Sequence, residues 1–431
     1  MSTTSEEKDQ LSKQAARMFY KNRLPFHVAE DPEFIKFCEM MRPGLGGKLL
    51  SRRDLSGKAL TNEHDTIEQE MRSSLKGKDV VLSQDGRSNL HNEAIIASCL
   101  HIPGKTFFHD AKEAKDATKD AEFCTQLAKD AILSAEEKYG CKVVGFVSDS
   151  EAKMVKVREN LKVWRGKEFI VYGCSAHYVN LIQTNATPST VKAHLVEIQK
   201  FFRNHQKPAA LLKGLGGKIP QLPNKTRWLS QRDFLETFNH NYEFYLKIRD
   251  ENPRLFSDKE RRILDNRQIK EAAVHMLQQL DVVAQILNTM QSDSSNLCDA
   301  MEGWLTLSTS PILSEDLKSE VKKRMDKAVT PHHILAKMVS TKGRIEMPVE
   351  MKQKGMEFAE EINFQFPAIL AAFEVEDESV FPASAFNAHI RNVMDPIHYW
   401  RHVEKNTMME PLKSFCDMAI RLHSCPPSSA G

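Results

Sequence analysis

The sequence predicts an α/β protein: a mixed sheet flanked by helices, with an all-α region before it and a large all-α region after it. Between residues 77 and 218, short apolar runs that end at turn residues alternate with segments of helical periodicity. Residues 229–327 show helical periodicity instead, without strand signals. The composition, with 41% hydrophobic and 27% charged residues, is that of an ordinary globular chain long enough for two or three domains.

Residues 1–76 are predicted to form a helical N-terminal region. Asp31 can cap a helix that begins at Pro32, because the carboxylate accepts backbone N–H groups and proline suits the first helical position. A linker rich in Gly and Pro at 42–47 then precedes an amphipathic helix at about 62–75.

Residues 77–218 are predicted to form the sheet and the helices that flank it. The expected strands are 79–86, 94–102, 105–111, 142–148 and 168–173, and the expected helices are 118–139, 152–164 and 176–183. Three strands that hairpins can join, followed by strand–helix–strand crossovers, make a mixed sheet. This order, β-β-β-α-β-α-β-α, is that of an RNase H-like domain.

Residues 219–390 are predicted to be a helical insertion, and residues 391–431 a C-terminal helical region. The polar N-terminus and the lack of an apolar run of about 18 residues indicate a soluble intracellular protein. The eight cysteines are scattered without a C-x-x-C pair, which favours a reducing compartment over a disulfide framework or a zinc finger. The net charge of +2 gives no general basic field, so any DNA contact must come from local patches.

Two aspartates occur where expected strands end. Asp85 ends the first strand, just before Gly86, and Asp149 follows the fourth. In an RNase H-like sheet these two strands are neighbours, which would bring the carboxylates together. Paired carboxylates repel each other unless a cation lies between them, and two Mg²⁺ ions about 4 Å apart are the usual clamp for phosphodiester chemistry. Alternatively, each Asp is a turn residue that hydrogen-bonds its own backbone, and the residues alone leave both interpretations open.

Several short motifs occur in an order that resembles the hAT superfamily of transposases and their domesticated relatives. They are LPF at 24–26, RPG at 42–44, LSQDGRSN at 82–89, VSDSEAKM at 147–154, CSAHYVNL at 174–181, TRWLS at 226–230, DP at 395–396, YW at 399–400, PL at 411–412 and PSSA at 427–430. Each motif is short, but together they extend over nearly the whole chain in the family's order. That order makes the resemblance specific.

The resemblance implies roles for residues in and beside the sheet. Asp85 and Asp149 would be the first two catalytic aspartates and would bind Mg²⁺. Cys174 and His177 would lie beside the active site. A lone C-x-x-H supplies only two of the ligands that zinc needs, so we expect His177 to have a structural or DNA-positioning role. The alternatives are a buried core thiol for Cys174 and a satisfied polar group at a helix start for His177.

The resemblance also implies a DNA contact and a dimerisation region. Trp228 would stack on a flipped base, and Arg227 would contact phosphate. Alternatively, Trp228 anchors the helical region as a core residue. Trp400, Leu412 and Phe415 would belong to the dimerisation region, although an apolar stripe at this spacing is more often the core of a single chain than an interface.

The chain departs from the family pattern near its C-terminus. The third catalytic acid of the family, a Glu, follows the motif at 427–430 within a few residues, and this sequence carries no such Glu. Arg87 stands where the family commonly has Trp, a lesser departure. We therefore expect a domesticated or truncated, catalytically inactive protein in the nucleus (otherwise the cytoplasm), acting through DNA contact or through dimerisation with itself or a related protein. The alternatives are an active Mg²⁺-dependent transposase or nuclease with an unidentified third acid, and a protein-interaction scaffold without DNA binding.

Overall fold

The computed structural model describes residues 4–43, 49–88, 93–113, 120–185, 189–224, 228–341 and 345–429. The chain divides into two compact units. The first comprises Met1–Lys78 with Glu136–Cys141, and the second comprises Asp79–Ala135 with Lys142–Gly431. Within the described residues, no helix is long and apolar enough to cross a membrane.

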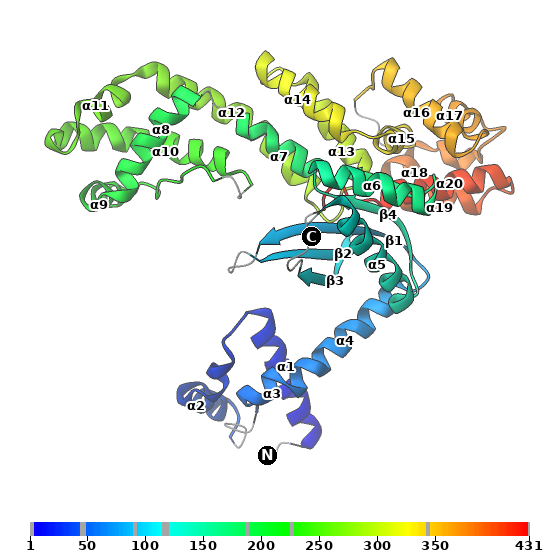
Figure 1. Ribbon diagram of the computed structural model, residues 1–431, viewed down its shortest axis with the longest axis horizontal. Helices are drawn as coiled ribbons and strands as arrows, with labels where there is room; N and C mark the ends of the chain where they lie inside the picture. The colour runs from blue at the N-terminus through cyan, green and yellow to red at the C-terminus, as the bar shows by residue number, and fades with distance from the viewer. Residues whose placement is uncertain are drawn as a thin grey trace. The chain divides into compact units, whose positions relative to one another are not determined.

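The first unit is helical, as predicted for the N-terminal region (Figure 1). Its helices are α1 (Ser5–Lys21), α2 (Pro32–Met41), α3 (Arg52–Ser56) and α4 (Lys58–Leu75), with a short 3-10 turn, η1 (Phe26–Glu30). The predicted cap of α2 is confirmed, because Asp31 accepts the backbone N–H groups of Glu33 and Phe34 at 3.0 and 3.2 Å. A small core forms around Phe19, whose ring meets Phe34 edge-on at 5.7 Å.

The second unit is built on a five-stranded mixed sheet. Its strands are β1 (Asp79–Ser88), β2 (Ala94–Ile102), β3 (Lys105–Glu113), β4 (Lys142–Ser148) and β5 (Ile170–Gly173), in the order β3-β2-β1-β4-β5. β1, β2 and β3 pair antiparallel, whereas β4 runs parallel to both β1 and β5. The predicted RNase H-like sheet, with its first and fourth strands side by side, is confirmed.

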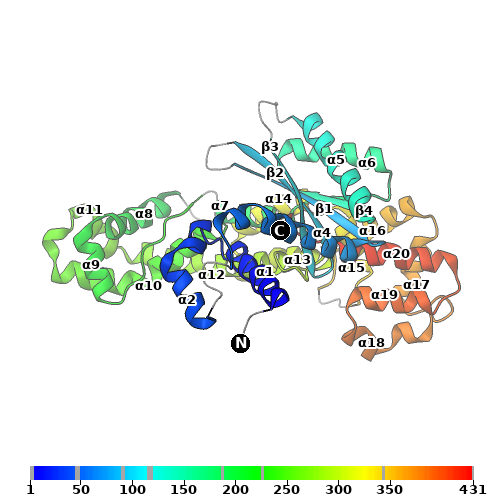
Figure 2. The ribbon, with the colours of Figure 1, turned by 90° about the horizontal axis from the view of Figure 1, so that it is seen from below.

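Helices cover both faces of this sheet. Figure 2 shows α5 (Ala121–Tyr139) and α6 (Ala152–Arg165) on one side, with α7 (Ser175–Asn185) and later helices on the other. Val81, Val147 and Tyr172 point into a large hydrophobic cluster shared with these later helices. β4 and the first half of β1 are buried on both faces, which is why they read as nearly continuous apolar runs in the sequence.

Helices α8 to α12 form a separate hydrophobic cluster within the second unit. They are α8 (Ser189–Asn204), α9 (Gln206–Gly214), α10 (Ser230–Glu251), α11 (Asp258–Asp265) and α12 (Arg267–Met290). Phe202 of α8 stacks on Tyr245 of α10 at 4.1 Å. The boundary predicted between residues 218 and 219 thus falls inside this cluster, because α8 and α9 bury their apolar faces against α10.

The remaining helices pack onto the sheet as one core. They are α13 (Leu297–Thr309), α14 (Glu315–Ala328), α15 (Pro331–Met338), α16 (Val349–Ile362), α17 (Phe366–Glu374), α18 (Ala388–Val393), α19 (Pro396–Lys405) and α20 (Glu410–Ser424). Trp304 and Trp400 are fully buried in this core. The predicted C-terminal region, from residue 391 onward, shares a hydrophobic cluster with Tyr172 of β5.

Candidate functional site

One predicted aspartate lies on β1, and the other directly follows the neighbouring strand β4. The parallel pairing of β1 with β4 runs as far as Gln84 and Ser148, and Asp85 and Asp149 are the next residues along the chain. β1 continues beyond its predicted end at residues 85–86, as far as Ser88. It continues because β2 pairs with β1 beyond the point where β4 ends, with Ala97 opposite Asp85.

Asp85 and His177 both influence the pKa of the Asp149 carboxyl. Burial raises the pKa of the Asp149 carboxyl, and the negative charges of Glu151 and Asp85 raise it further. The backbone N–H of Glu151, which donates to Asp149 Oδ1 at 3.0 Å, and the nearby His177 oppose this rise. Since charge–charge interactions weaken with distance, these influences define a local cluster. We call Asp85, Asp149 and His177 the carboxylate edge.

A buried arginine that the sequence analysis missed holds the backbone at this edge. Arg158 of α6 is only 8% exposed, and its Nη1 donates to Ser148 Oγ at 2.7 Å and to the Asp149 carbonyl oxygen at 2.8 Å. Burial lowers the pKa of this guanidinium. The signal was present in the sequence, because Arg158 occupies the same helix face as the buried Met154, Val157 and Leu161. A charged residue at a core position of a helix indicates a buried polar contact.

Cys174 joins three segments beside the carboxylate edge. Its backbone N–H donates to the Ser148 carbonyl at 2.7 Å. Its Sγ accepts the backbone N–H groups of His177 and Ser429, both at 3.3 Å. The thiol is 1% exposed. Cys174 therefore acts as a buried acceptor that fixes the start of α7, in keeping with the core-thiol alternative, while the His177 side chain is only partly buried.

The segment after α20 packs against the same place. The Tyr172 hydroxyl donates to the Pro426 carbonyl at 2.7 Å, and the Ser175 N–H donates to the Pro427 carbonyl at 2.9 Å. Ser428 and Ser429 are both buried. The motif at 427–430 is thus held next to Cys174 as far as the structure describes it.

The donor set at the carboxylate edge suits a hard cation. Two carboxylates on adjacent strands offer the oxygen ligands that Mg²⁺ prefers. No group of three or more His, Cys, Asp or Glu side chains able to hold a metal occurs among the described residues. Asp85 and Asp149 therefore stand as a two-carboxylate arrangement.

Trp228, one of the two predicted DNA-contact residues, lies just before the start of α10. Trp228 is partly buried and packs against the large core cluster. This position is compatible with a core residue and also with a side chain on which a base stacks. Arg227 lies outside the described residues. Leu229, the next residue after Trp228, caps α10 with a left-handed backbone (φ 59°).

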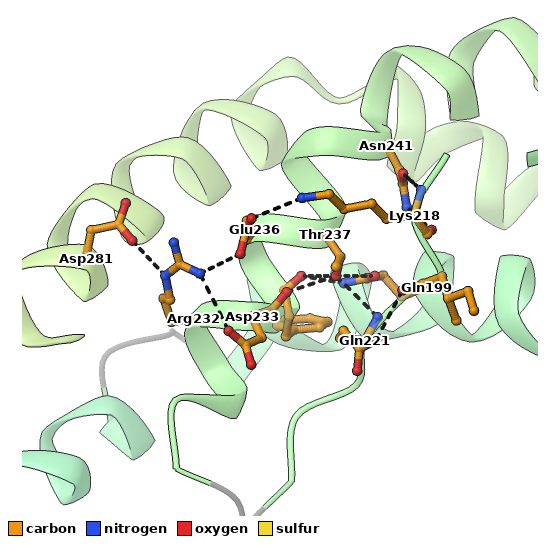
Figure 3. Close-up of polar contacts among 11 residues, drawn as sticks. Gln199, Lys218, Gln221, Arg232, Asp233, Glu236, Thr237, Asn241 and Asp281 are labelled. Carbon is orange, nitrogen blue, oxygen red and sulfur yellow. Dashed lines mark hydrogen bonds and ion pairs between the residues drawn. The ribbon is translucent and has the colours of Figure 1, made fainter. Parts of the chain in front are cut away.

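Polar side chains of α10 fix the chain that leads to Trp228. Figure 3 shows Asn241 and Thr237 facing this segment. The Asn241 amide accepts the Lys218 N–H at 2.9 Å and donates to the Lys218 carbonyl at 2.8 Å. Thr237 Oγ1 accepts the Gln221 N–H at 3.2 Å. Residues 218–224 are therefore anchored along α10.

The residues predicted for dimerisation are core residues of a single chain. Trp400, Leu412 and Phe415 are each 0% exposed. Trp400 Nε1 donates to the Val339 carbonyl at 3.0 Å. Their side chains stabilise the packing of α19 and α20 and leave no surface for a second copy to contact directly. The apolar stripe that they form is an intramolecular one.

One comparison with known proteins matches this part of the chain. Residues 50–200 match the family model described as "Domain of unknown function (DUF659)", a family associated with hAT-like, transposase-related proteins. The match contains all five strands and the residues Asp85, Asp149, Cys174 and His177. None of the curated proteins compared with the chain matches it.

Proposed function

We propose that this chain is a hAT-like, transposase-related protein in which Asp85 and Asp149 bind a divalent cation at a DNA contact. The observation that carries the proposal is the position of the two carboxylates, one residue beyond the last paired residues of adjacent parallel strands. A cation relieves the repulsion between them, and a phosphate group is the natural additional ligand of such a cation.

The residues around the pair keep it in place. Arg158 holds the backbone between Ser148 and Asp149 from behind, and Cys174 holds the start of α7, which carries His177. Mg²⁺, when bound by Asp85 and Asp149, would supply positive charge for a phosphate oxygen. Arg227 and Trp228 are the DNA contacts that the resemblance implies, and Trp228 packs against the hydrophobic cluster that also contains Tyr172 and Cys174.

We propose further that the chain binds DNA without completing strand transfer. Two carboxylates, with no third metal-binding side chain grouped with them among the described residues, give an incomplete set of ligands for the paired ions of phosphodiester chemistry, so we expect the cation to bind weakly. The proposal assigns no role in self-association to Trp400, Leu412 and Phe415, because these side chains are buried.

Cation binding is tested by titrating Mn²⁺ and following its electron paramagnetic resonance signal. We expect Asp85→Asn and Asp149→Asn each to weaken Mn²⁺ binding at least about tenfold, as loss of a ligand or its support does at metal sites. Asp326→Asn, an exposed change on α14, is the matched control and should bind as the parent chain does. Equal Mn²⁺ affinity in all four proteins would refute the cation site.

Strand cleavage is tested separately, with supercoiled DNA and Mg²⁺ or Mn²⁺. We expect no metal-dependent nicking above the level of an Asp85→Ala variant. Nicking that the parent chain shows and Asp85→Ala loses would overturn the proposed inactivity, yet it would leave the cation site in place.

A further inference from the structure

A long stretch of the second unit carries positive charge alone. Residues 198–232 contain eight Lys and Arg residues and no Asp or Glu, in a chain whose net charge is only +2. The basic residues are Lys200, Arg203, Lys207, Lys213, Lys218, Lys225, Arg227 and Arg232. The charge balance of the whole chain therefore conceals a strongly basic segment.

Four of these side chains lie on the exposed side of α8 and α9. Both helices turn their apolar residues, among them Phe202 and Leu212, into the cluster shared with α10. Lys200, Arg203, Lys207 and Lys213 are exposed, and none of the four forms an ion pair within the part of the chain that the structure describes. We call these four residues the α8–α9 basic face.

Two neighbouring basic residues, Lys218 and Arg232, form ion pairs within the chain. The Arg232 guanidinium donates to Asp281 at 2.8 Å and also pairs with Glu236, while Lys218 Nζ lies 3.2 Å from Glu236 (Figure 3). These acidic partners lie on α10 and α12, and they neutralise the two cations. The ion pairs thus serve the fold, whereas the positive charge of the basic face remains available to a partner.

The basic face leads toward the predicted DNA contact. Arg203 Nη1 donates to the Pro220 carbonyl at 3.3 Å, which ties the end of α8 to the 218–224 segment. Figure 1 shows the chain leaving α9 and running alongside α10 toward the start of that helix, Ser230, which Trp228 precedes by two residues. The positive charges therefore precede Trp228 along one continuous stretch of this helical region.

We infer that the α8–α9 basic face binds the sugar–phosphate backbone of duplex DNA. Lysine and arginine side chains without acidic partners neutralise phosphates and release counterions, which gives sequence-independent affinity. The exposed positions that accompany the lysines on α9 include Ala210 and Gly214, whose small size allows a backbone to approach closely. The inference rests on the proposed binding of DNA. It adds a DNA-binding surface that does not depend on Asp85 or Asp149.

The test is the salt dependence of DNA binding by the full chain, measured by fluorescence anisotropy of a labelled duplex between about 50 and 200 mM salt. The variant is Lys200→Gln with Lys207→Gln and Lys213→Gln. Three lost phosphate contacts should make the negative slope of log K against log salt less steep by about 2.7. The matched control is Lys322→Gln with Lys323→Gln and Lys327→Gln, three exposed lysines on α14. Circular dichroism should show both variants folded.

Three results would overturn the inference. The first is an equal loss of slope in the α14 control, which would mean a general charge effect. The second is displacement of DNA by polyglutamate at equal charge concentration, which would assign the face to acidic peptides. The third is a slope near zero for the parent chain. Mn²⁺ binding, measured on the same lysine variant, should be unchanged, so failure of the cation site and failure of the basic face can be told apart.

Discussion

The carboxylate edge and the α8–α9 basic face bring their residues together in opposite ways. Asp85, Asp149 and His177 come from β1, from the end of β4 and from α7, and only the strand order makes them neighbours. The basic face comes from two consecutive helices and lies exposed on them. Changes to the first region should therefore alter stability and cation binding together, whereas changes to the second should alter binding alone.

The largest effect should come from the core that the sheet shares with α20. Phe415→Ala removes a buried ring that meets Phe366 at 5.3 Å and Trp400 at 5.5 Å. We expect a loss of about 3–5 kcal/mol in the free energy of unfolding, measured by urea denaturation. Sedimentation should show the same mass before and after the change. A dimeric parent that the change converts to a stable monomer would restore the dimerisation role.

Next comes the arginine behind the carboxylate edge. Arg158→Met leaves the Ser148 hydroxyl and the Asp149 carbonyl without their buried donor, and we expect a cost of about 3 kcal/mol. Lys207→Gln on the basic face serves as the contrast and should change stability by less than about 0.5 kcal/mol. If the two variants unfold at the same urea concentration, the buried Arg158 contributes no more to stability than the exposed Lys207 does, contrary to our expectation.

A smaller effect concerns the pH dependence of stability. Burial lowers the pKa of His333 to about 3, and its neutral ring accepts the Thr330 N–H at Nδ1 and donates to Ser175 Oγ from Nε2. Below about pH 6.5 the unfolded chain binds a proton at this histidine and the folded chain does not. The free energy of unfolding therefore decreases as the pH is lowered, until the pH reaches the pKa of the folded state. One such histidine costs about 2 kcal/mol between pH 7 and pH 5.

His333→Gln should remove that part of the acid sensitivity. We expect the melting temperature of the variant to fall less between about pH 7 and pH 5 than that of the parent chain. His332 and His423, whose pKa values burial lowers to about 3 and about 4, should sustain the remaining loss. Parallel curves for parent and variant would show that His333 is not the neutral buried group described above.

The smallest effect should come from Asp149 itself. Its folded-state pKa is raised, so the ionised carboxyl lowers stability once pH rises through the acid range, and the cost persists at neutral pH. Asp149→Asn keeps the acceptor for the Glu151 N–H and should raise the melting temperature at neutral pH but not at about pH 3. A lower melting temperature of Asp149→Asn than of the parent chain at neutral pH would show that the ionised Asp149 carboxylate does not destabilise the fold.

The sequence indicated most of the sheet because buried strands appear as apolar runs that end at breakers. It misplaced the end of β1, since the pairing of Arg87 and Ser88 with β2 depends on a partner strand rather than on local residues. It missed Arg158 because a helical pattern cannot tell which polar contact a buried cation makes. It left open whether Trp400, Leu412 and Phe415 serve the core or an interface, because an apolar stripe does not identify what covers it; in the structure all three side chains are buried.

By itself, the sequence determined the order of the strands and helices, the candidate pair Asp85 and Asp149, and the run of positive charge at 198–232. These are properties of neighbouring residues, set by periodicity, turn chemistry and composition. Only the tertiary structure decided that pairing with β2 extends β1 to Ser88, that Arg158 supports Asp149, and that α19 and α20 close the core. Those facts depend on contacts between residues far apart in the chain, which local patterns do not encode.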